Sequence, residues 1–182
     1  MRRFVFAVFA CMAGTSISTA EESVYQTDFG AWRFMCQLHE DLPDDCRAAQ
    51  GVRDTRDASR WIRVTLSLRE EKGDAALYFT IPRPKVTFEP RDEGGVVVVI
   101  DAYKGTLHLN EDVCSATECV IDWRLDTPSL VRLGSSKEMF FIFPIEENRG
   151  LGLSISLDGF AESYLALLNV REANESKKAN TK

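Results

Sequence analysis

The stretch GAWRFMCQL, residues 30–38, decides the fold class, because its large apolar side chains recur at every second position. In an extended chain Trp32, Phe34 and Cys36 share one side, and Arg33 points the other way. Successive residues of a β-strand face opposite sides of the sheet, so this period predicts a strand with one face on the core and one in water. The stretch therefore favours a fold built from half-buried strands.

Other stretches extend this pattern along the chain. The same alternation recurs at Trp61 to Leu68, Cys119 to Leu125 and Leu151 to Leu157. Repeated alternation over short stretches is typical of antiparallel sheets that are wet on one side. The sequence therefore predicts several such strands.

Three further runs are apolar at consecutive positions: Ala75 to Ile81, Val96 to Ile100, and Met139 to Phe143. They are short, rich in β-branched and aromatic residues, and bounded by turn residues, which favours buried strands over helices. A strand that is apolar on both faces needs a cover on both faces. The cover is expected to be a second sheet, a helix or another subunit.

A single helix is predicted near the C-terminus. Asp158 can act as its N-cap, Gly159 opens the turn, and apolar residues recur at helical spacing up to Asn169. Residues 171–182 contain no large apolar side chain, which predicts a disordered polar tail. Residues 41–60 show little periodicity and are interpreted as a loop. Short strands and one late helix predict a mainly β fold: an antiparallel β-sandwich or flattened barrel with one C-terminal helix.

The first twenty residues have the pattern of a cleavable export signal. Arg2 and Arg3 precede the apolar run Phe4 to Ala13, and small residues follow, so cleavage is expected between Ala20 and Glu21. The apolar run is about half of the roughly 20 residues needed to span a bilayer. No transmembrane segment is therefore expected after cleavage.

Cleavage would leave one domain. Residues 21–170 are expected to form a single disulfide-braced β-domain that begins with a polar lead at residues 21–27. A lipoprotein alternative would instead make Cys11 the lipidated first residue, but that would leave an unusually short signal. Mass spectrometry of the exported protein distinguishes the two, because a lipidated Cys11 is incompatible with cleavage after Ala20.

The charge balance excludes two classes of partner. Without Arg2 and Arg3 the chain has 20 basic and 28 acidic residues, a formal charge of −8. Nucleic-acid binding needs clustered Lys and Arg to replace counterions, and attachment to an anionic membrane surface needs a polybasic segment. The net negative charge argues against nucleic acid and an anionic membrane surface as partners. The charged residues are spread along the chain, which favours a role in solubility.

Four cysteines follow the signal, and four cysteines allow three pairings. Cys36 and Cys46 flank a turn-rich segment, and Cys114 and Cys119 bracket a hairpin tip. Geometry therefore favours these two short-range pairs. Closing such short loops stabilises a fold by roughly 2–3 kcal/mol each. We expect the bridges to hold hairpin registers rather than to link distant parts of the chain.

A metal site or a redox site is the competing interpretation of these cysteines. Zinc clusters use closer spacings, often with histidine, whereas here nine and four residues separate the paired thiols. The motif Cys-x-x-Cys of redox pairs is absent. The two histidines, His39 and His108, are isolated in the sequence. These features favour structural disulfides, and no metal and no cofactor is predicted.

No motif predicts catalysis. The chain has no Gly-x-Ser-x-Gly elbow and no phosphate-binding glycine loop. His39 beside Glu40 and Asp41 is interpreted as a solvated loop residue. The basic spot Arg83-Pro84-Lys85 is interpreted as a rigid polar turn at a strand end. Trp61 lies off the apolar register of its strand, so it is the tryptophan to test for surface exposure and sugar stacking.

Several landmarks together resemble the bacterial invasion-associated locus B family. In chain order they are FGAWRFMC at residues 29–36, Cys46 followed by Ala49-Gln50, the strand Val96 to Asp101, the pair Cys114 and Cys119, and LDGFA at residues 157–161. The resemblance covers about residues 28–168. The sequence departs from the family pattern in two places: it has Arg83 and Lys85, and it has no glycine between Cys114 and Cys119. The resemblance implies a secreted or periplasmic, all-β protein linked by name to host-cell invasion, and it supplies no catalytic residues.

The sequence thus predicts an exported, non-enzymatic β-domain in the periplasm or outside the cell. It would act through contacts with an unidentified protein or cell-envelope component, and an oligomer is compatible with this expectation. The alternative is a periplasmic small-ligand or lipid-binding protein with a pocket between sheets or under the helix. An enzyme with an unfamiliar site is the third hypothesis.

Overall fold

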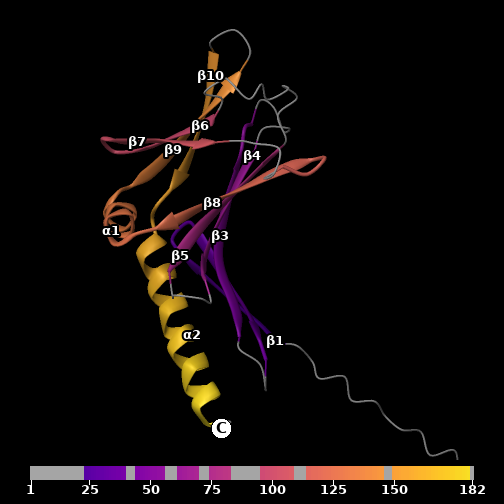
Figure 1. The fold of residues 1–182 in the computed structure, drawn as a ribbon, viewed down its shortest axis with the longest axis vertical. Helices are drawn as coiled ribbons and strands as arrows, with labels where there is room; N and C mark the ends of the chain where they lie inside the picture. The colour runs from indigo at the N-terminus through magenta and orange to yellow at the C-terminus, as the bar shows by residue number, and fades with distance from the viewer. Residues whose placement is uncertain are drawn as a thin grey trace, which may run out of the picture.

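The computed structural model describes residues 23–39, 44–55, 61–69, 74–82, 95–108, 114–145 and 149–180. The predicted signal with its cleavage site at Ala20 and Glu21 lies outside the described residues, as does the basic spot at Arg83 to Lys85. The described residues form two antiparallel sheets and two helices (Figure 1).

The larger sheet is a meander of sequential hairpins with one late addition. Its order is β1 (Ser23–Phe29), β2 (Trp32–Leu38), β3 (Asp45–Arg53), β4 (Trp61–Leu68), β5 (Ala75–Pro82) and β8 (Glu118–Leu125). The smaller sheet has the order β10 (Arg149–Ser156), β9 (Glu138–Ile145), β6 (Gly95–Ile100) and β7 (Tyr103–His108). Helix α1 (Thr127–Ser135) joins β8 to β9, and α2 (Phe160–Asn180) follows β10.

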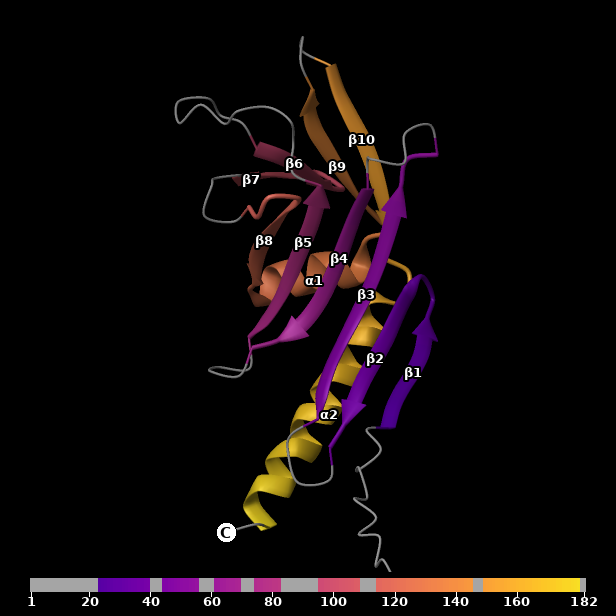
Figure 2. The same cartoon turned by 90° about the vertical axis from the view of Figure 1, so that its right-hand side faces the viewer.

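The two sheets form a sandwich-like fold, which confirms the predicted fold class, and within the described residues neither sheet closes into a barrel. The inner face of the larger sheet has two covers. The smaller sheet packs on the β5 side, where the rings of Phe79 and Phe141 meet edge to face at 5.3 Å. Helix α2 lies behind β2 and β3 in Figure 2 and covers the other side.

The buried core contains the apolar residues that the alternating pattern of the strands predicted to face inward. On β2 the buried side chains are Trp32, Phe34 and Cys36, with Trp32 fully excluded from solvent, while Arg33 is exposed. Strand β5 is buried on nearly all of its length, as its continuous apolar run predicted. Strand β9 differs, because only one of its faces is covered in this single chain.

Two strands and one short helix differ from the sequence-based predictions. Strand β1 occupies most of the predicted polar lead, because its backbone pairs with β2 along its whole length. Strand β3 crosses the region predicted to be a loop and joins β2 to β4. Helix α1 was not predicted, although Asp126 caps it by accepting a hydrogen bond from Ser129 N–H at 2.9 Å and Pro128 stands in its first turn.

Two glycine turns dock onto each other at the start of α2. Gly30 links β1 to β2 with a φ of +52°, and Gly159 precedes α2 with a φ of +85°. The N–H of Ala31 donates to the carbonyl of Asp158 at 3.0 Å. A Cβ on Gly159 would lie 1.8 Å from the carbonyl oxygen of Phe29. The close approach is therefore possible only without a side chain at position 159.

The same contact brings together two motifs that are far apart in the sequence. Trp32 follows the first turn and Phe160 follows the second, and their rings meet edge to face at 5.5 Å. Both side chains are buried. The docked turns thus place the first residue of α2 directly on the core side of β2, and the helix then runs along the inner face of the sheet.

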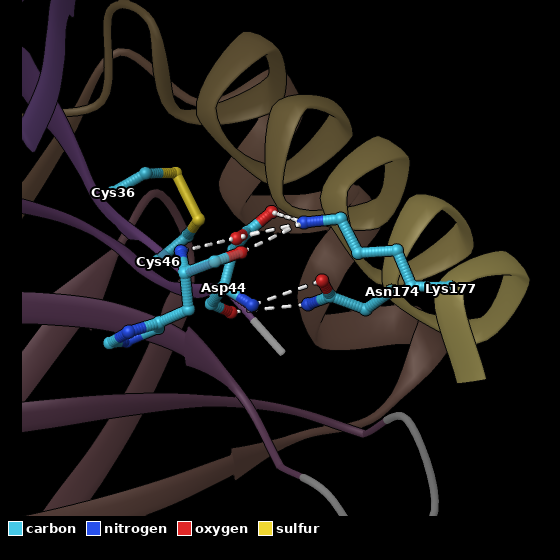
Figure 3. The surroundings of a disulfide bond; sticks show 6 residues. Cys36, Asp44, Cys46, Asn174 and Lys177 are labelled. Carbon is cyan, nitrogen blue, oxygen red and sulfur yellow. Dashed lines mark hydrogen bonds and ion pairs between the residues drawn. A yellow bond between two sulfur atoms is a disulfide. The ribbon is translucent and has the colours of Figure 1, made fainter. Parts of the chain in front are cut away.

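Helix α2 continues to Asn180, so residues 171–180 of the predicted disordered tail at residues 171–182 are helical. This segment has no large apolar side chain to bury, but polar contacts with residue 44 hold the second half of the helix. The backbone N–H of Asp44 donates to Asn174 Oδ1 at 3.0 Å, and Asn174 Nδ2 donates to the Asp44 carbonyl at 3.1 Å (Figure 3). Good helix formers such as Glu, Ala and Lys support the extension.

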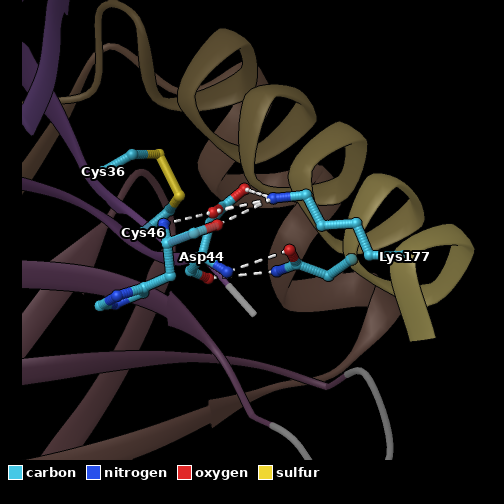
Figure 4. A network of polar contacts seen from close by, with 6 residues as sticks. Cys36, Asp44, Cys46 and Lys177 are labelled. Carbon is cyan, nitrogen blue, oxygen red and sulfur yellow. Dashed lines mark hydrogen bonds and ion pairs between the residues drawn. A yellow bond between two sulfur atoms is a disulfide. The ribbon is translucent and has the colours of Figure 1, made fainter. Parts of the chain in front are cut away.

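Lys177 completes this connection between the helix and the β2–β3 loop. Its ammonium lies 3.0 Å from Asp44 Oδ2, close to the Cys36–Cys46 bridge (Figure 4). Partial burial acts to raise the pKa of the Asp44 carboxyl, but the N–H of His39 and the Lys177 ammonium lower it, so the pKa lies below its usual value of 3.8. The ionised carboxylate therefore stabilises the folded state.

We expect Gly159→Ala to lower the free energy of unfolding by about 3 kcal/mol or more, because it combines left-handed backbone strain with a backbone clash. Gly152→Ala is the matched control, since a Cβ there meets no atom within 4 Å; its effect should stay within about 1 kcal/mol. Urea unfolding of both variants checks this. Equal effects of the two substitutions would show that the docked turns do not hold the fold.

Replacement of Asp44 by Asn should lower the melting temperature by a few degrees at pH 7, because the variant loses about 1 kcal/mol of charge-assisted bonding. Because the pKa of the Asp44 carboxyl is lower in the folded state, its ionisation stabilises the folded protein at pH values above the unfolded-state pKa. This contribution disappears as the pH falls through the folded-state pKa. The two melting temperatures should therefore converge as the pH falls below the folded-state pKa of Asp44. The exposed neighbour Asp45→Asn is the control. A difference that persists at low pH would contradict the ion pair.

Candidate functional site

A shallow groove crosses the outer face of the larger sheet, over β2, β3 and β4. This face is turned toward the viewer in Figure 2, with α2 behind the sheet. The groove has a volume of about 970 Å³. Its floor contains the small residues Ala49 and Gly51, and its sides carry the longer Arg33, Met35 and Arg63. The hollow therefore follows from small side chains on the central strand between large ones on its neighbours.

The strand register places three arginines around this floor. Arg33 pairs across β2 and β3 with Ala49, and Arg63 pairs across β3 and β4 with Gly51. Arg53 lies two pairs beyond Gly51 along β3, on the same face. Neighbouring strands are about 4.8 Å apart and alternate residues about 6.8 Å apart, so the Cα atoms of Arg53 and Arg63 are separated by about 8 Å. Their long side chains can reach one ligand.

Trp61 forms the end of the groove. It is the cross-strand partner of Arg53 and is half-buried, so the indole is neither part of the core nor fully solvated. The sequence had singled out this tryptophan for exposure, and the structure places it in the groove lining. The tryptophans Trp32 and Trp123 lie on the inner side of the sheet, where Trp32 meets Phe160 edge to face and Trp123 stacks with Phe79.

The groove is positive although the chain is acidic. Its charged lining residues are Asp28, Arg33, Arg53 and Arg63, which give a net charge of +2. Arg33 Nε donates to Asp28 Oδ1 at 3.0 Å, and this hydrogen bond, together with the charge of Asp28, raises the pKa of the Arg33 guanidinium. Within the described ranges no carboxylate lies at ion-pair distance from Arg53 or Arg63. These two guanidinium groups can bind an external anion.

A second exposed surface lies on the outer side of the smaller sheet. Phe140 is 45% exposed and Ile142 is 40% exposed, and they follow each other on the outer side of β9. Val99 and Val97 are their partners on β6 and are partly exposed. We call these four residues the apolar face. Gly152 on β10 pairs with Ile142 and leaves open space beside it.

The cysteines lie at two hairpins. The structure joins Cys36 to Cys46 and Cys114 to Cys119 as disulfides. The first pair is directly opposite in the register of β2 and β3. The second brackets the turn before β8, where Ser115 Oγ accepts hydrogen bonds from the turn. Each bridge therefore holds the register of a local hairpin.

His39 follows β2 of the larger sheet, whereas His108 ends β7 of the smaller sheet. His39 is half-buried at the end of β2, and its backbone N–H donates to Asp44 Oδ1 at 3.0 Å. The side chain of His108 lies outside the described part of the structure. Among the described residues no group of three or more His, Cys, Asp or Glu side chains could hold a metal ion.

The groove was not predicted from the sequence, because one of its arginines lies in a segment that has no strand-like periodicity of apolar residues. Arg33 and Arg63 occupy outward positions of strands that the sequence predicted, but Arg53 falls in the segment interpreted as a loop. The signal was present in RAAQGVR, residues 47–53, where arginine and small residues alternate with the core-facing positions. Recognition of that strand would have placed Ala49 and Gly51 beneath the arginines.

Comparison with known proteins agrees with the fold. A family model described as "Invasion associated locus B (IalB) protein" matches residues 32–168. A crystal structure of invasion associated protein B from Bartonella henselae matches with a TM-score of 0.61 and 15% identity, over 81% of this chain and 99% of that chain. At this identity the structural likeness shows the fold alone. No curated protein sequence matches the chain significantly.

Peptide mapping of the exported protein without reductant should recover the pairs Cys36–Cys46 and Cys114–Cys119. The expectation rests on the strand register, which places the first pair opposite each other and the second across a hairpin tip. Mapping after reduction and alkylation is the control for reshuffling. A peptide that joins Cys36 to Cys114 or Cys119, or four free thiols, would contradict both bridges.

Proposed function

Since this chain belongs to the invasion associated locus B family, we propose that it is an exported, non-enzymatic β-domain that acts through contacts with a protein or cell-envelope component. The proposed location is the periplasm or the outside of the cell, and contact with a host cell is the role that the family name implies. The observation that carries the proposal is the apolar face of the smaller sheet.

The apolar face has the composition of a contact surface. Single exposed apolar residues are ordinary on soluble proteins, but neighbouring large ones mark interaction sites. Phe140 and Ile142 lie side by side with Val97 and Val99 at the centre of the sheet, on β9 and β6. Burial of apolar surface contributes roughly 25 cal/mol per Å². Burial of this face against a partner would therefore stabilise the complex.

The cysteine chemistry supports a binding role in an exported protein. A thiolate is the form of cysteine that attacks substrates or binds metals, and a disulfide removes it. Both described cysteine pairs are bridged. Disulfides persist in oxidising compartments such as the periplasm and the cell exterior. Among the described residues, no helix is long and apolar enough to cross a membrane.

Crosslinking in intact cells tests the proposed contact. The double variant Phe140→Ser, Ile142→Thr should lose the crosslinked partner that the unmodified protein retains, because it removes the two most exposed apolar side chains of the face. The matched control is Val131→Thr with Leu165→Gln, which removes two exposed apolar side chains from α1 and α2, outside this face. Both purified variants should keep the circular dichroism spectrum of the unmodified protein.

Two outcomes would contradict the proposal. One is crosslinking that is unchanged by the apolar-face variant. The other is an enzymatic activity that a single substitution abolishes. Native mass spectrometry after gentle purification addresses the alternative, since a lipid or small molecule carried through purification would favour a periplasmic ligand-binding protein.

A further inference from the structure

We propose that the groove on the outer face of the larger sheet binds an acidic oligosaccharide of a cell surface. This site lies on a different sheet from the apolar face, so it does not depend on the contact proposed above. Three features support it: two guanidinium groups without an acidic partner among the described residues, a half-buried indole and a floor of small side chains.

The arginines select a ligand with separated negative charges. Arg53 and Arg63 have no acidic partner within the described ranges, and Arg33 shares its charge with Asp28. A guanidinium binds carboxylate, sulfate or phosphate through two parallel hydrogen bonds. From Arg33 on β2 to Trp61 on β4 the groove spans about 17 Å between Cα atoms. One small anion cannot bridge that distance, whereas an oligosaccharide with charges on successive rings can.

Trp61 supplies the contact that a simple anion site lacks. An indole offers a large, flat apolar surface with one hydrogen-bond donor, and such rings are favoured where a ligand has one apolar and one polar side. Sugar rings have apolar C–H faces and polar edges. Because Trp61 is half-buried beside Arg53, it can stack on a sugar ring while the guanidinium binds a charged substituent.

The sheet geometry disfavours the other polyanions. The backbone N–H and C=O groups of β3 are used in ladders with β2 and β4, so an extended acidic peptide would find no free strand edge in the groove. Nucleic acids require many basic contacts, whereas this groove has a net charge of +2 on an acidic chain. Side-chain recognition of a short acidic glycan fits both limits.

Isothermal titration of the mature protein at low salt provides the test, with a heparin-derived tetrasaccharide as the probe. Maltotetraose is the uncharged probe of equal length, and inorganic pyrophosphate is the charged probe without a sugar ring. We expect binding of the tetrasaccharide, no binding of maltotetraose, and weaker binding of pyrophosphate. Higher salt should weaken the affinity, because the arginines are exposed.

Variants assign the binding to the groove. Arg53→Gln with Arg63→Gln should weaken tetrasaccharide binding by about tenfold or more, because two charge-assisted contacts are lost. The matched control is Arg47→Gln with Arg124→Gln, which removes the same charge from exposed positions of the same sheet face outside the groove lining. Tetrasaccharide binding should also change the tryptophan fluorescence of the unmodified protein but not that of Trp61→Phe.

Each contrary result overturns the assignment. Absence of tetrasaccharide binding at low salt would exclude the site. If the two double variants weakened tetrasaccharide binding equally, the ligand would be attracted by the overall charge of the sheet face and not bound in the groove. Pyrophosphate binding as tight as that of the tetrasaccharide, or a fluorescence change that persists in Trp61→Phe, would show that the indole does not stack on a sugar. None of these outcomes depends on the crosslinking result for the apolar face.

Discussion

The contact between the Gly30 turn and the Gly159 turn is the constraint on which the rest of the structure depends. It joins the hairpin at the beginning of the described chain to the helix at its end through one backbone hydrogen bond, from Ala31 to Asp158. Backbone approaches backbone so closely that no side chain fits at Gly159. Because α2 starts at this point, the contact sets where the helix lies on the sheet.

This placement determines how the inner and outer faces are used. Helix α2 takes the inner face over β1 to β3, and the smaller sheet takes the inner face over β5. Both covers come from the same side, so the outer faces of both sheets are left for other contacts. The larger sheet presents a positive groove there, and the smaller sheet presents the apolar face. One folding solution thus yields two chemically different surfaces.

The Cys36–Cys46 disulfide and the charged contacts of Asp44 stabilise the same hairpin. The Cys36–Cys46 bridge holds β2 to β3 close to Asp44, which in turn binds Asn174 and Lys177 of α2 (Figure 3). The same hairpin carries Arg33 and Ala49 of the groove on its outer side. A covalent link and an ion pair on the inner side therefore support the strand register that forms the groove on the other side.

The sequence by itself determined the fold class, most strands and the start of the last helix, because periodicity and caps are local properties. Alternation on β2 and β4 placed Arg33 and Arg63 outward correctly. Local rules failed where partners come from elsewhere: β3 needs two neighbouring strands, and the end of α2 needs Asp44. The groove was decided only by tertiary structure, because Arg53, Trp61 and Gly51 become neighbours through the register of β3 and β4, and register is a property of paired strands.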